Sequence, residues 1–181
     1  MRIVAGEWRG RKLVAPPGDV TRPTADRTRE TLFNMLASRV GTFEGLNVVD
    51  LFAGSGALGL EALSRGASSC LFVEQDAHAV KTIRQNIDML SAGARASVQQ
   101  VSVMSLGPAK APHDLLLLDP PYDTGAGHVA LDRLARLGWF GPASWIALET
   151  AAKETRDLRD FELVAERKTG KAKILLLRPA R

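Results

Sequence analysis

Cysteine is nearly absent from this sequence and histidine is scarce. The single cysteine, Cys70, cannot form an internal disulfide, so a reducing, cytoplasmic location is expected. The three histidines are scattered, and no group of cysteine, histidine and acidic residues has the spacing of metal ligands. Neither a disulfide framework nor a metal site is therefore expected.

Long apolar runs are also missing. Runs such as residues 115–118 and 174–177 fall far short of the ~20 residues that a membrane-spanning helix needs. The first residues carry charges where a signal peptide would need its apolar stretch, so no membrane partner is expected. A chain of 181 residues with 45% hydrophobic and 24% charged residues is typical of a soluble globular domain.

Acidic residues are few at both ends of the chain. The net charge is +4, and residues 1–29 carry all of it, because they hold seven basic and three acidic residues. A second basic stretch follows Glu166, after which no acidic residue occurs. Such blocks suit a polyanion, since each phosphate contact releases a counterion, although a merely solvated surface is the alternative. The early basic residues that we expect to contact nucleic acid are Arg9, Arg11, Lys12, Arg22 and Arg27.

Residues 1–22 alternate short apolar runs with glycine and proline. This pattern predicts a small basic β-hairpin arm that ends in a Pro/Gly loop. Asp26 can cap a following helix, whose apolar positions Leu32, Phe33, Leu36 and Val40 share one face. We therefore expect an arm over residues 1–22 and one folded domain over residues 23–181.

From residue 47 onward, apolar runs alternate with helical patterns. The runs at 48–52, 70–73, 97–101, 115–118 and 144–148 indicate buried parallel strands, with helices between them at 57–65, 77–91 and 128–137. Residues 161–167 and 173–178 look like two antiparallel strands that close the sheet. The prediction is an α/β domain with a mostly parallel seven-stranded sheet and an antiparallel final strand, which binds ligands at the carboxyl ends of its strands.

A glycine-rich loop follows the first of these strands, in the sequence Asp50-Leu51-Phe52-Ala53-Gly54-Ser55-Gly56. Gly54 and Gly56 allow a tight turn close to a ligand, and Gly59 allows close packing of the next helix. Glu74 ends the second strand, 24 residues after Asp50, where an acid can accept hydrogen bonds from ribose hydroxyls. A dinucleotide fold and a methyl-donor fold both fit these features.

The fourth strand leads directly into Asp119-Pro120-Pro121-Tyr122. Two prolines end the strand in a rigid turn, so Asp119 and the freed carbonyls can point at one guest group. Accepting hydrogen bonds from the exocyclic amine of a base stabilises the positive charge that develops as a methyl group is transferred. Tyr122 offers a flat face for stacking of that base. We interpret these four residues as catalytic.

The tetrapeptide resembles the signature of amino-methyltransferases that act on adenine N6 or guanine N2. Residues 6–13, 22–34 and 56–67 resemble the RsmD family of bacterial 16S rRNA guanine-N2 methyltransferases. This resemblance implies a Rossmann-like class I methyltransferase fold, S-adenosylmethionine as cofactor, and 16S rRNA as partner, possibly within a small ribosomal subunit or an assembly intermediate. It leaves two alternatives, an adenine-N6 methyltransferase of DNA or RNA and a non-catalytic RNA-binding assembly factor.

The resemblance also implies a set of cofactor-binding residues. They are Asp50, Phe52, Ala53, Gly54, Ser55, Gly56, Glu74, Ser102, Val103 and Thr24. One departure concerns the end of the third strand, where many relatives carry an Asp or Asn for the cofactor adenine. This sequence reads Val101-Ser102-Val103-Met104 there, so Ser102 or the adjacent backbone would have to supply that contact.

Overall fold

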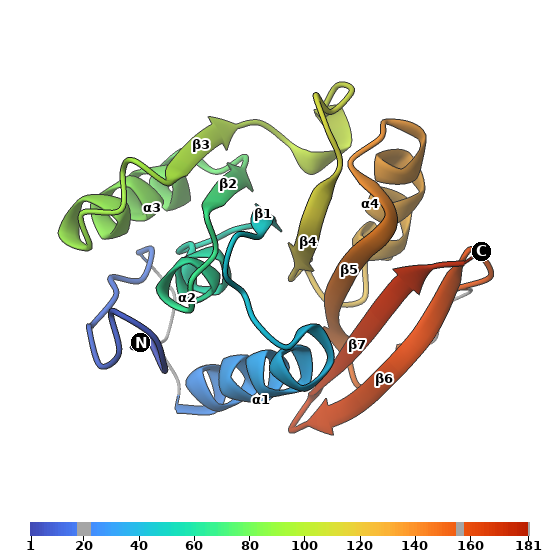
Figure 1. Ribbon diagram of the computed structural model, residues 1–181, viewed down its shortest axis with the longest axis horizontal. Helices are drawn as coiled ribbons and strands as arrows, with labels where there is room; N and C mark the ends of the chain where they lie inside the picture. The colour runs from blue at the N-terminus through green and yellow to red at the C-terminus, as the bar shows by residue number, and fades with distance from the viewer. Residues whose placement is uncertain (18–22, 155–157, 181) are drawn as a thin grey trace.

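A computed structural model describes residues 1–17, 23–154 and 158–180, apart from the side chains of residues 23 and 24 (Figure 1). Within these residues, seven strands form one sheet in the order β3-β2-β1-β4-β5-β7-β6. The strands are β1 (Asn47–Leu51), β2 (Ser69–Glu74), β3 (Ala96–Gln100), β4 (His113–Leu118), β5 (Phe140–Ala151), β6 (Phe161–Thr169) and β7 (Ala172–Pro179).

Strands β1 to β5 pair in parallel, whereas β7 runs antiparallel to both β5 and β6. The α/β class and the antiparallel final strand are thus confirmed. The strand order reverses between β1 and β4, where the chain moves from one half of the sheet to the other. Ligands of doubly wound sheets bind at the carboxyl ends of the strands beside this reversal.

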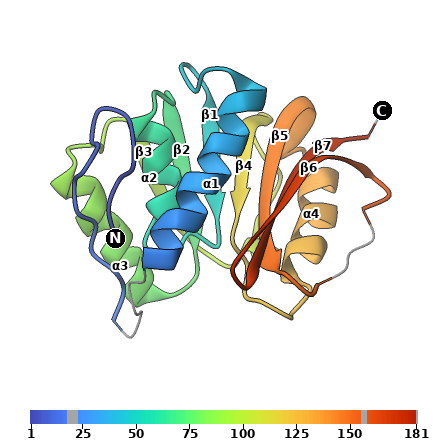
Figure 2. The same ribbon diagram turned by 90° about the horizontal axis from the view of Figure 1, so that it is seen from below.

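Helices cover both faces of the sheet (Figures 1 and 2). Helices α1 (Pro23–Val40), α2 (Ala57–Ser64) and α3 (Ala77–Met89) pack on one face, around a core that includes Phe33, Leu60 and Ile83. Helix α4 (Ala126–Arg136) and the short 3-10 helix η1 (Val103–Ser105) cover the other face. Successive strand residues alternate between the two cores, so Val48 packs with the first set and Val49 with the second.

Of the β-hairpin arm predicted over residues 1–22, the structure describes residues 1–17, and these do not form a pair of strands. Within residues 1–17 the pairing is limited to one isolated antiparallel bridge between Arg2 and Lys12. Beyond this bridge the chain turns onto helix α2, which takes the amide of Ala5 that a longer ladder would use. Glu61 accepts hydrogen bonds from the amides of Val4 and Ala5, at 2.9 Å and 3.0 Å.

This N-terminal segment (residues 1–17) packs onto the domain through apolar side chains as well. Ile3, Trp8 and Leu13 are buried in the same core as α1 and α2. Asn86 of α3 also holds the segment, since its side chain accepts from Val14 N at 2.8 Å and donates to Val14 O at 3.0 Å. The segment therefore lies against the domain instead of projecting from it.

None of the described helices is both long enough and apolar enough to cross a bilayer.

Candidate active site

Four neighbouring parallel strands are aligned in register where β1 and β4 end, although β5 continues beyond this level to Ala151. Leu51 of β1 is in register with Val73 of β2 and with Leu118 of β4, and Leu118 is in register with Leu148 of β5. The residues that follow these four are Phe52, Glu74, Asp119 and Glu149. The register therefore gathers one aromatic and three acidic side chains along a single edge of the sheet.

The glycine-rich loop leaves this edge in an unusual backbone conformation. Phe52, Gly54 and Gly56 have φ angles of 59°, 58° and 83°, in the left-handed region. Such a conformation costs a non-glycine residue about 1–2 kcal/mol, so Phe52 is strained at a position that borders the site. A Cβ atom on Gly54 would meet no atom within 4 Å, so the loop backbone is open to a ligand at this point.

Asp50 stabilises the loop from beneath. Its carboxylate Oδ2 accepts a hydrogen bond from Gly59 N at 2.9 Å, and the residue is 1% exposed. Burial raises the pKa of Asp50 to about 8, against the lowering effect of the Gly59 hydrogen bond and with a smaller contribution from the charge of Glu74. Gly59 lies so close to the sheet that a Cβ atom there would sit 2.4 Å from the Phe72 ring, which explains the glycine.

Glu74 is held in place by two backbone donors. Its Oε1 accepts from Gly54 N at 2.9 Å and its Oε2 accepts from Asp76 N at 2.8 Å. Asp76 itself caps α3 by accepting from Ala79 N. Each carboxylate oxygen of Glu74 keeps a further lone pair, so the side chain can still accept hydrogen bonds from a ligand.

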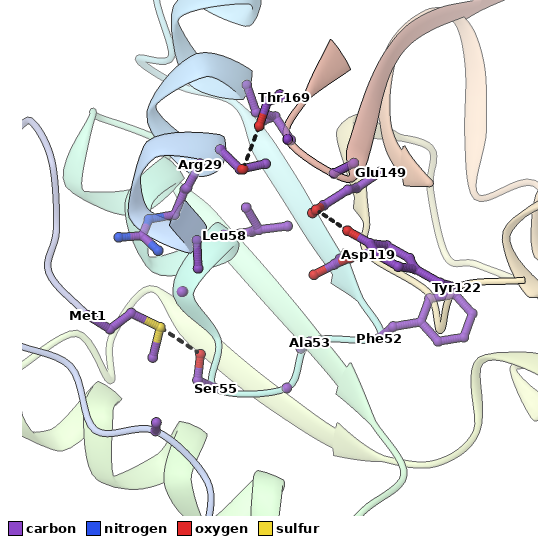
Figure 3. A pocket seen from close by; sticks show the side chains of 18 of the residues that line it. Met1, Arg29, Phe52, Ala53, Ser55, Leu58, Asp119, Tyr122, Glu149 and Thr169 are labelled. Carbon is purple, nitrogen blue, oxygen red and sulfur yellow. Dashed lines mark hydrogen bonds between the residues drawn. The ribbon is translucent and has the colours of Figure 1, made fainter. Parts of the chain in front are cut away.

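Two hollows meet over the strand ends. The larger, of about 660 Å³, lies between the glycine-rich loop, α1, the ends of β4 and β5, and the turn between β6 and β7. The smaller, of about 440 Å³, lies between the ends of β1, β2 and β4 and the start of η1. Three residues line both hollows: Phe52, Asp119 and Tyr122. Figure 3 shows them in the wall of the larger hollow.

At this junction Asp119, Tyr122 and Glu149 form a polar group. The Tyr122 hydroxyl donates a hydrogen bond of 2.8 Å to Glu149 Oε1 (Figure 3). Desolvation, followed by the charge and the side-chain hydrogen bond of Glu149, raises the pKa of Asp119 well above its usual value. Asp119 borders both hollows and its side chain is accessible there, so a guest in either hollow can reach the carboxyl group.

Residues 1–178 match the family model described as Conserved hypothetical protein 95. The chain is 39% identical over 150 residues to Ribosomal RNA small subunit methyltransferase D of Escherichia coli (strain K12), covering 83% of this chain and 74% of that protein. It is 37% identical over 175 residues to the protein of the same name from Haemophilus influenzae, covering 94% and 89%. The solved structure of the putative methyltransferase yhhF from Escherichia coli matches with a TM-score of 0.85 at 38% identity, covering 100% of this chain and 99% of that chain.

The chain belongs to the RsmD family. The resemblance that its sequence motifs indicate is therefore confirmed. Its sheet has the order and the antiparallel strand of the class I methyltransferase fold, as the sequence predicts. The two hollows at the strand ends are the candidate active site of this RsmD-family protein.

The residues expected to bind the cofactor do not all reach the hollows. Phe52, Ala53, Gly54 and Ser55 line the larger hollow, and Phe52, Glu74, Ser102 and Val103 line the smaller one. Asp50 and Gly56 are absent from both linings. Thr24 lies in α1, but its side chain is outside the described part of the chain. Ser102 caps η1, since its hydroxyl oxygen accepts from Met104 N at 3.2 Å.

The structure also locates the residues that were expected to act in catalysis and to contact nucleic acid. Asp119, Pro120, Pro121 and Tyr122 all line the smaller hollow. Arg9, Arg11 and Lys12 are exposed on the N-terminal segment, and Arg27 is exposed on α1. Arg22 lies outside the described residues.

Sequence reasoning missed a further set of lining residues in this RsmD-family site. Glu149 directly follows the apolar run at residues 144–148 but was not among the residues interpreted as functional, and β5 itself continues to Ala151. The rule that identified Asp119, an acid directly after a buried strand, would have found it. Thr28 of α1 and Thr169 of the β6–β7 turn are joined by a hydrogen bond of 2.7 Å across the larger hollow, and no local pattern signals this contact.

Proposed function

We propose that this member of the RsmD family transfers a methyl group from S-adenosylmethionine to the exocyclic N2 of a guanine in 16S rRNA. The observation that carries the proposal is the position of Asp119 and Tyr122 where the two hollows meet, beside the glycine-rich loop. S-adenosylmethionine bound in one hollow and the target base bound in the other would then meet at this junction. The relatives named as ribosomal RNA small subunit methyltransferases support the substrate class.

The residues at the strand ends fit the proposed cofactor. Gly54 leaves open space in front of the loop backbone, and Glu74 retains lone pairs for ribose hydroxyls. Ser102 and Val103 line the smaller hollow, where an adenine would pack against Val103 and meet the hydroxyl of Ser102. Asp50 and Gly56 would act indirectly, by fixing the conformation of the loop. S-adenosylmethionine, when bound, supplies an electrophilic methyl group carried on a sulfonium.

The chain's own contribution to the reaction is to position and polarise the amine. Asp119 follows β4 directly, and Pro120 is buried behind it, so the carboxyl is held rigidly at the junction. A raised pKa keeps this carboxyl protonated to higher pH than a free aspartate, and its carbonyl oxygen then accepts from the amine as an amide oxygen would. Tyr122, 42% exposed at the mouth of both hollows, is available to stack on an unstacked base.

We assign RNA binding to the N-terminal residues 1–22 and to the start of α1. Arg9, Arg11, Lys12 and Arg27 are exposed, and Met1 and Ala15 line the larger hollow, so the basic segment borders the proposed base site. The partner would be 16S rRNA, free or in a small ribosomal subunit or assembly intermediate. Such a substrate places the reaction in the cytoplasm.

Methyl transfer from labelled S-adenosylmethionine tests the proposal. Small ribosomal subunits lacking the modification, free 16S rRNA and double-stranded DNA are offered separately, and the products are digested to nucleosides. We expect labelled N2-methylguanosine in 16S rRNA. Labelled N6-methyladenosine would assign the adenine alternative, and donor binding without any transfer would assign a non-catalytic RNA-binding factor.

A further inference from the structure

Glu149 lies in the larger hollow as the neighbour of Asp119. Leu118 of β4 and Leu148 of β5 are in register, so the two acids follow at the same level on adjacent strands. Adjacent strands are about 4.8 Å apart, and the side chains of Asp119 and Glu149 lie next to each other and reach into the same hollow (Figure 3). Both line the larger hollow. The site therefore presents two carboxyl groups side by side, whereas the catalytic tetrapeptide supplies only one.

The hydrogen-bonding capacity of Glu149 is only partly used. One oxygen accepts from the Tyr122 hydroxyl at 2.8 Å, and the interaction of Glu149 with Asp119 contributes to the raised pKa of Asp119. A carboxylate has about four lone-pair positions, so Glu149 can accept at least one more donor from the hollow. The side chain is only partly buried, so a guest in the hollow can reach it.

A guanine matches this pair of groups through its chemistry. Its exocyclic N2 amine and its N1–H are adjacent donors on one edge of the ring. When the N2 amine faces Asp119, the adjacent N1–H faces the acceptor beside Asp119, which is Glu149. Adenine and 2-aminopurine carry an amine beside an unprotonated ring nitrogen, which would oppose a carboxylate at the same place. A site built to accept from an N–H rejects an analogue that lacks it, because the acceptor is left without a partner.

We propose that Glu149 is the specificity-determining residue of the site, accepting the N1–H of the target guanine while Asp119 accepts from N2. This inference rests on the proposed guanine-N2 methylation and adds the group that reads the base. Tyr122 has a second role in it. Its hydrogen bond holds Glu149 with the remaining lone pairs facing the hollow.

The test compares guanine with 2-aminopurine, which keeps the N2 amine and lacks N1–H. After the methylated position has been mapped with the wild-type protein, 16S rRNA is assembled by ligation with either base at that position. Each RNA is offered free and reconstituted into small subunits. The measured quantity is the ratio of kcat/KM for guanine to kcat/KM for 2-aminopurine, in the wild type and in Glu149→Gln. The matched control, Glu162→Gln, removes the same charge from the exposed face of β6.

Glu149→Gln replaces a charged acceptor by an amide, which can accept from the N1–H of guanine but can also donate to the unprotonated N1 of 2-aminopurine. We therefore expect the guanine preference to fall about 10- to 100-fold. Glu162→Gln should keep the wild-type preference. Tyr122→Phe guards against a general disturbance of the site: its rates should fall, yet its preference should stay above that of Glu149→Gln. An unchanged preference in a folded Glu149→Gln that still produces N2-methylguanosine overturns the role of Glu149 alone. Absence of N2-methylguanosine with the wild type overturns the proposed function and this inference together.

Discussion

A Cβ atom on Gly6 would lie 1.9 Å from the carbonyl oxygen of Ser64. The two residues join the N-terminal segment to the end of α2. Beside them, Glu7 N donates to the Ser64 carbonyl at 2.9 Å, and the Ser64 hydroxyl donates to Ala5 O at 2.7 Å. Since Ser64 belongs to a packed helix, neither backbone can move away cheaply.

We therefore expect Gly6→Ala to detach the N-terminal segment. Gly10→Ala is the matched control, because Gly10 also has a positive φ of 83° but a Cβ there would meet nothing within 4 Å. The control should lose only the conformational cost, about 1–2 kcal/mol of unfolding free energy. Gly6→Ala should lose clearly more, together with hydrogen-exchange protection of residues 1–17. Equal losses in urea unfolding would show that the close approach to Ser64 is not a constraint.

The pH dependence of stability should contain a contribution from Asp50. Its folded pKa of about 8 lies above the ordinary aspartate pKa of 3.8, so the native state keeps a proton that the unfolded chain releases. The contribution is complete below pH 3.8 and is lost as pH rises toward 8. Wild-type unfolding free energy should therefore fall relative to that of Asp50→Asn, by up to about 1.4 kcal/mol per pH unit in this window. Urea unfolding at pH 5 and pH 7.5 measures it, and parallel pH profiles of the two proteins would contradict it.

Glu74 should affect binding of the donor more than the chemical step. Glu74→Ala removes both the proposed ribose acceptor and the acceptor of Gly54 N. We expect the Kd for S-adenosylmethionine to rise about 10- to 100-fold, as for a lost hydrogen bond to a charged group. The single-turnover rate at saturating donor should change far less. Calorimetry measures the Kd and rapid-quench assays measure the chemical step. Glu74→Gln retains one acceptor oxygen, so its Kd should lie between those of the wild type and Glu74→Ala.

The sequence identifies the site residues that directly follow the parallel strands better than it identifies the ends of β5 or the structure of the N-terminal segment. Phe52, Glu74 and Asp119 follow apolar runs, and parallel strands bring such positions to one edge whatever the loops between them do. Glu149 follows the same rule, because it comes directly after the apolar run at 144–148. The sequence does not show that β5 continues to Ala151, because that extension depends on pairing with β7. The hairpin prediction failed for a related reason. Alternating apolar residues fit a ladder, but the next ladder donor, the amide of Ala5, donates to Glu61, 56 residues away in the sequence.

We expect methyl transfer to depend on the protonated, uncharged form of Asp119. Asp119→Asn keeps a carbonyl oxygen in place of the protonated carboxyl, so we expect its transfer rate at pH 7 to stay within about tenfold of the wild type. Asp119→Ala loses the acceptor and should lose about 10²–10³ in rate. Because the pKa of Asp119 is raised, the wild-type rate should fall as pH rises through that pKa, whereas the Asn variant should not follow it. A rate in Asp119→Asn as low as in Asp119→Ala would assign catalysis to the ionised carboxylate.

The last prediction concerns the basic side chains of the N-terminal segment. Arg9, Arg11 and Lys12 are exposed on a segment whose residues Met1 and Ala15 border the larger hollow. Arg11 also donates to Met89 O at 2.8 Å, so its guanidinium is partly held on the protein surface. If these cations contact phosphates, replacing all three by alanine should weaken RNA binding while S-adenosylmethionine affinity stays within about twofold of the wild type. The log of the affinity should also fall less steeply with the log of salt concentration, by about 0.7–0.9 per lost contact.

A second triple variant controls for the change in net charge. Lys81, Arg84 and Lys110 are exposed and line neither hollow, so their replacement by alanine removes the same three charges elsewhere. Long-range attraction alone would weaken RNA binding equally in both variants. Direct contact requires a larger loss and a shallower salt slope in the N-terminal variant. If that variant instead binds as the wild type does, the phosphate contacts belong to the other basic stretch, around Arg167, Lys168 and Lys171, where the β6–β7 turn forms the opposite wall of the hollow.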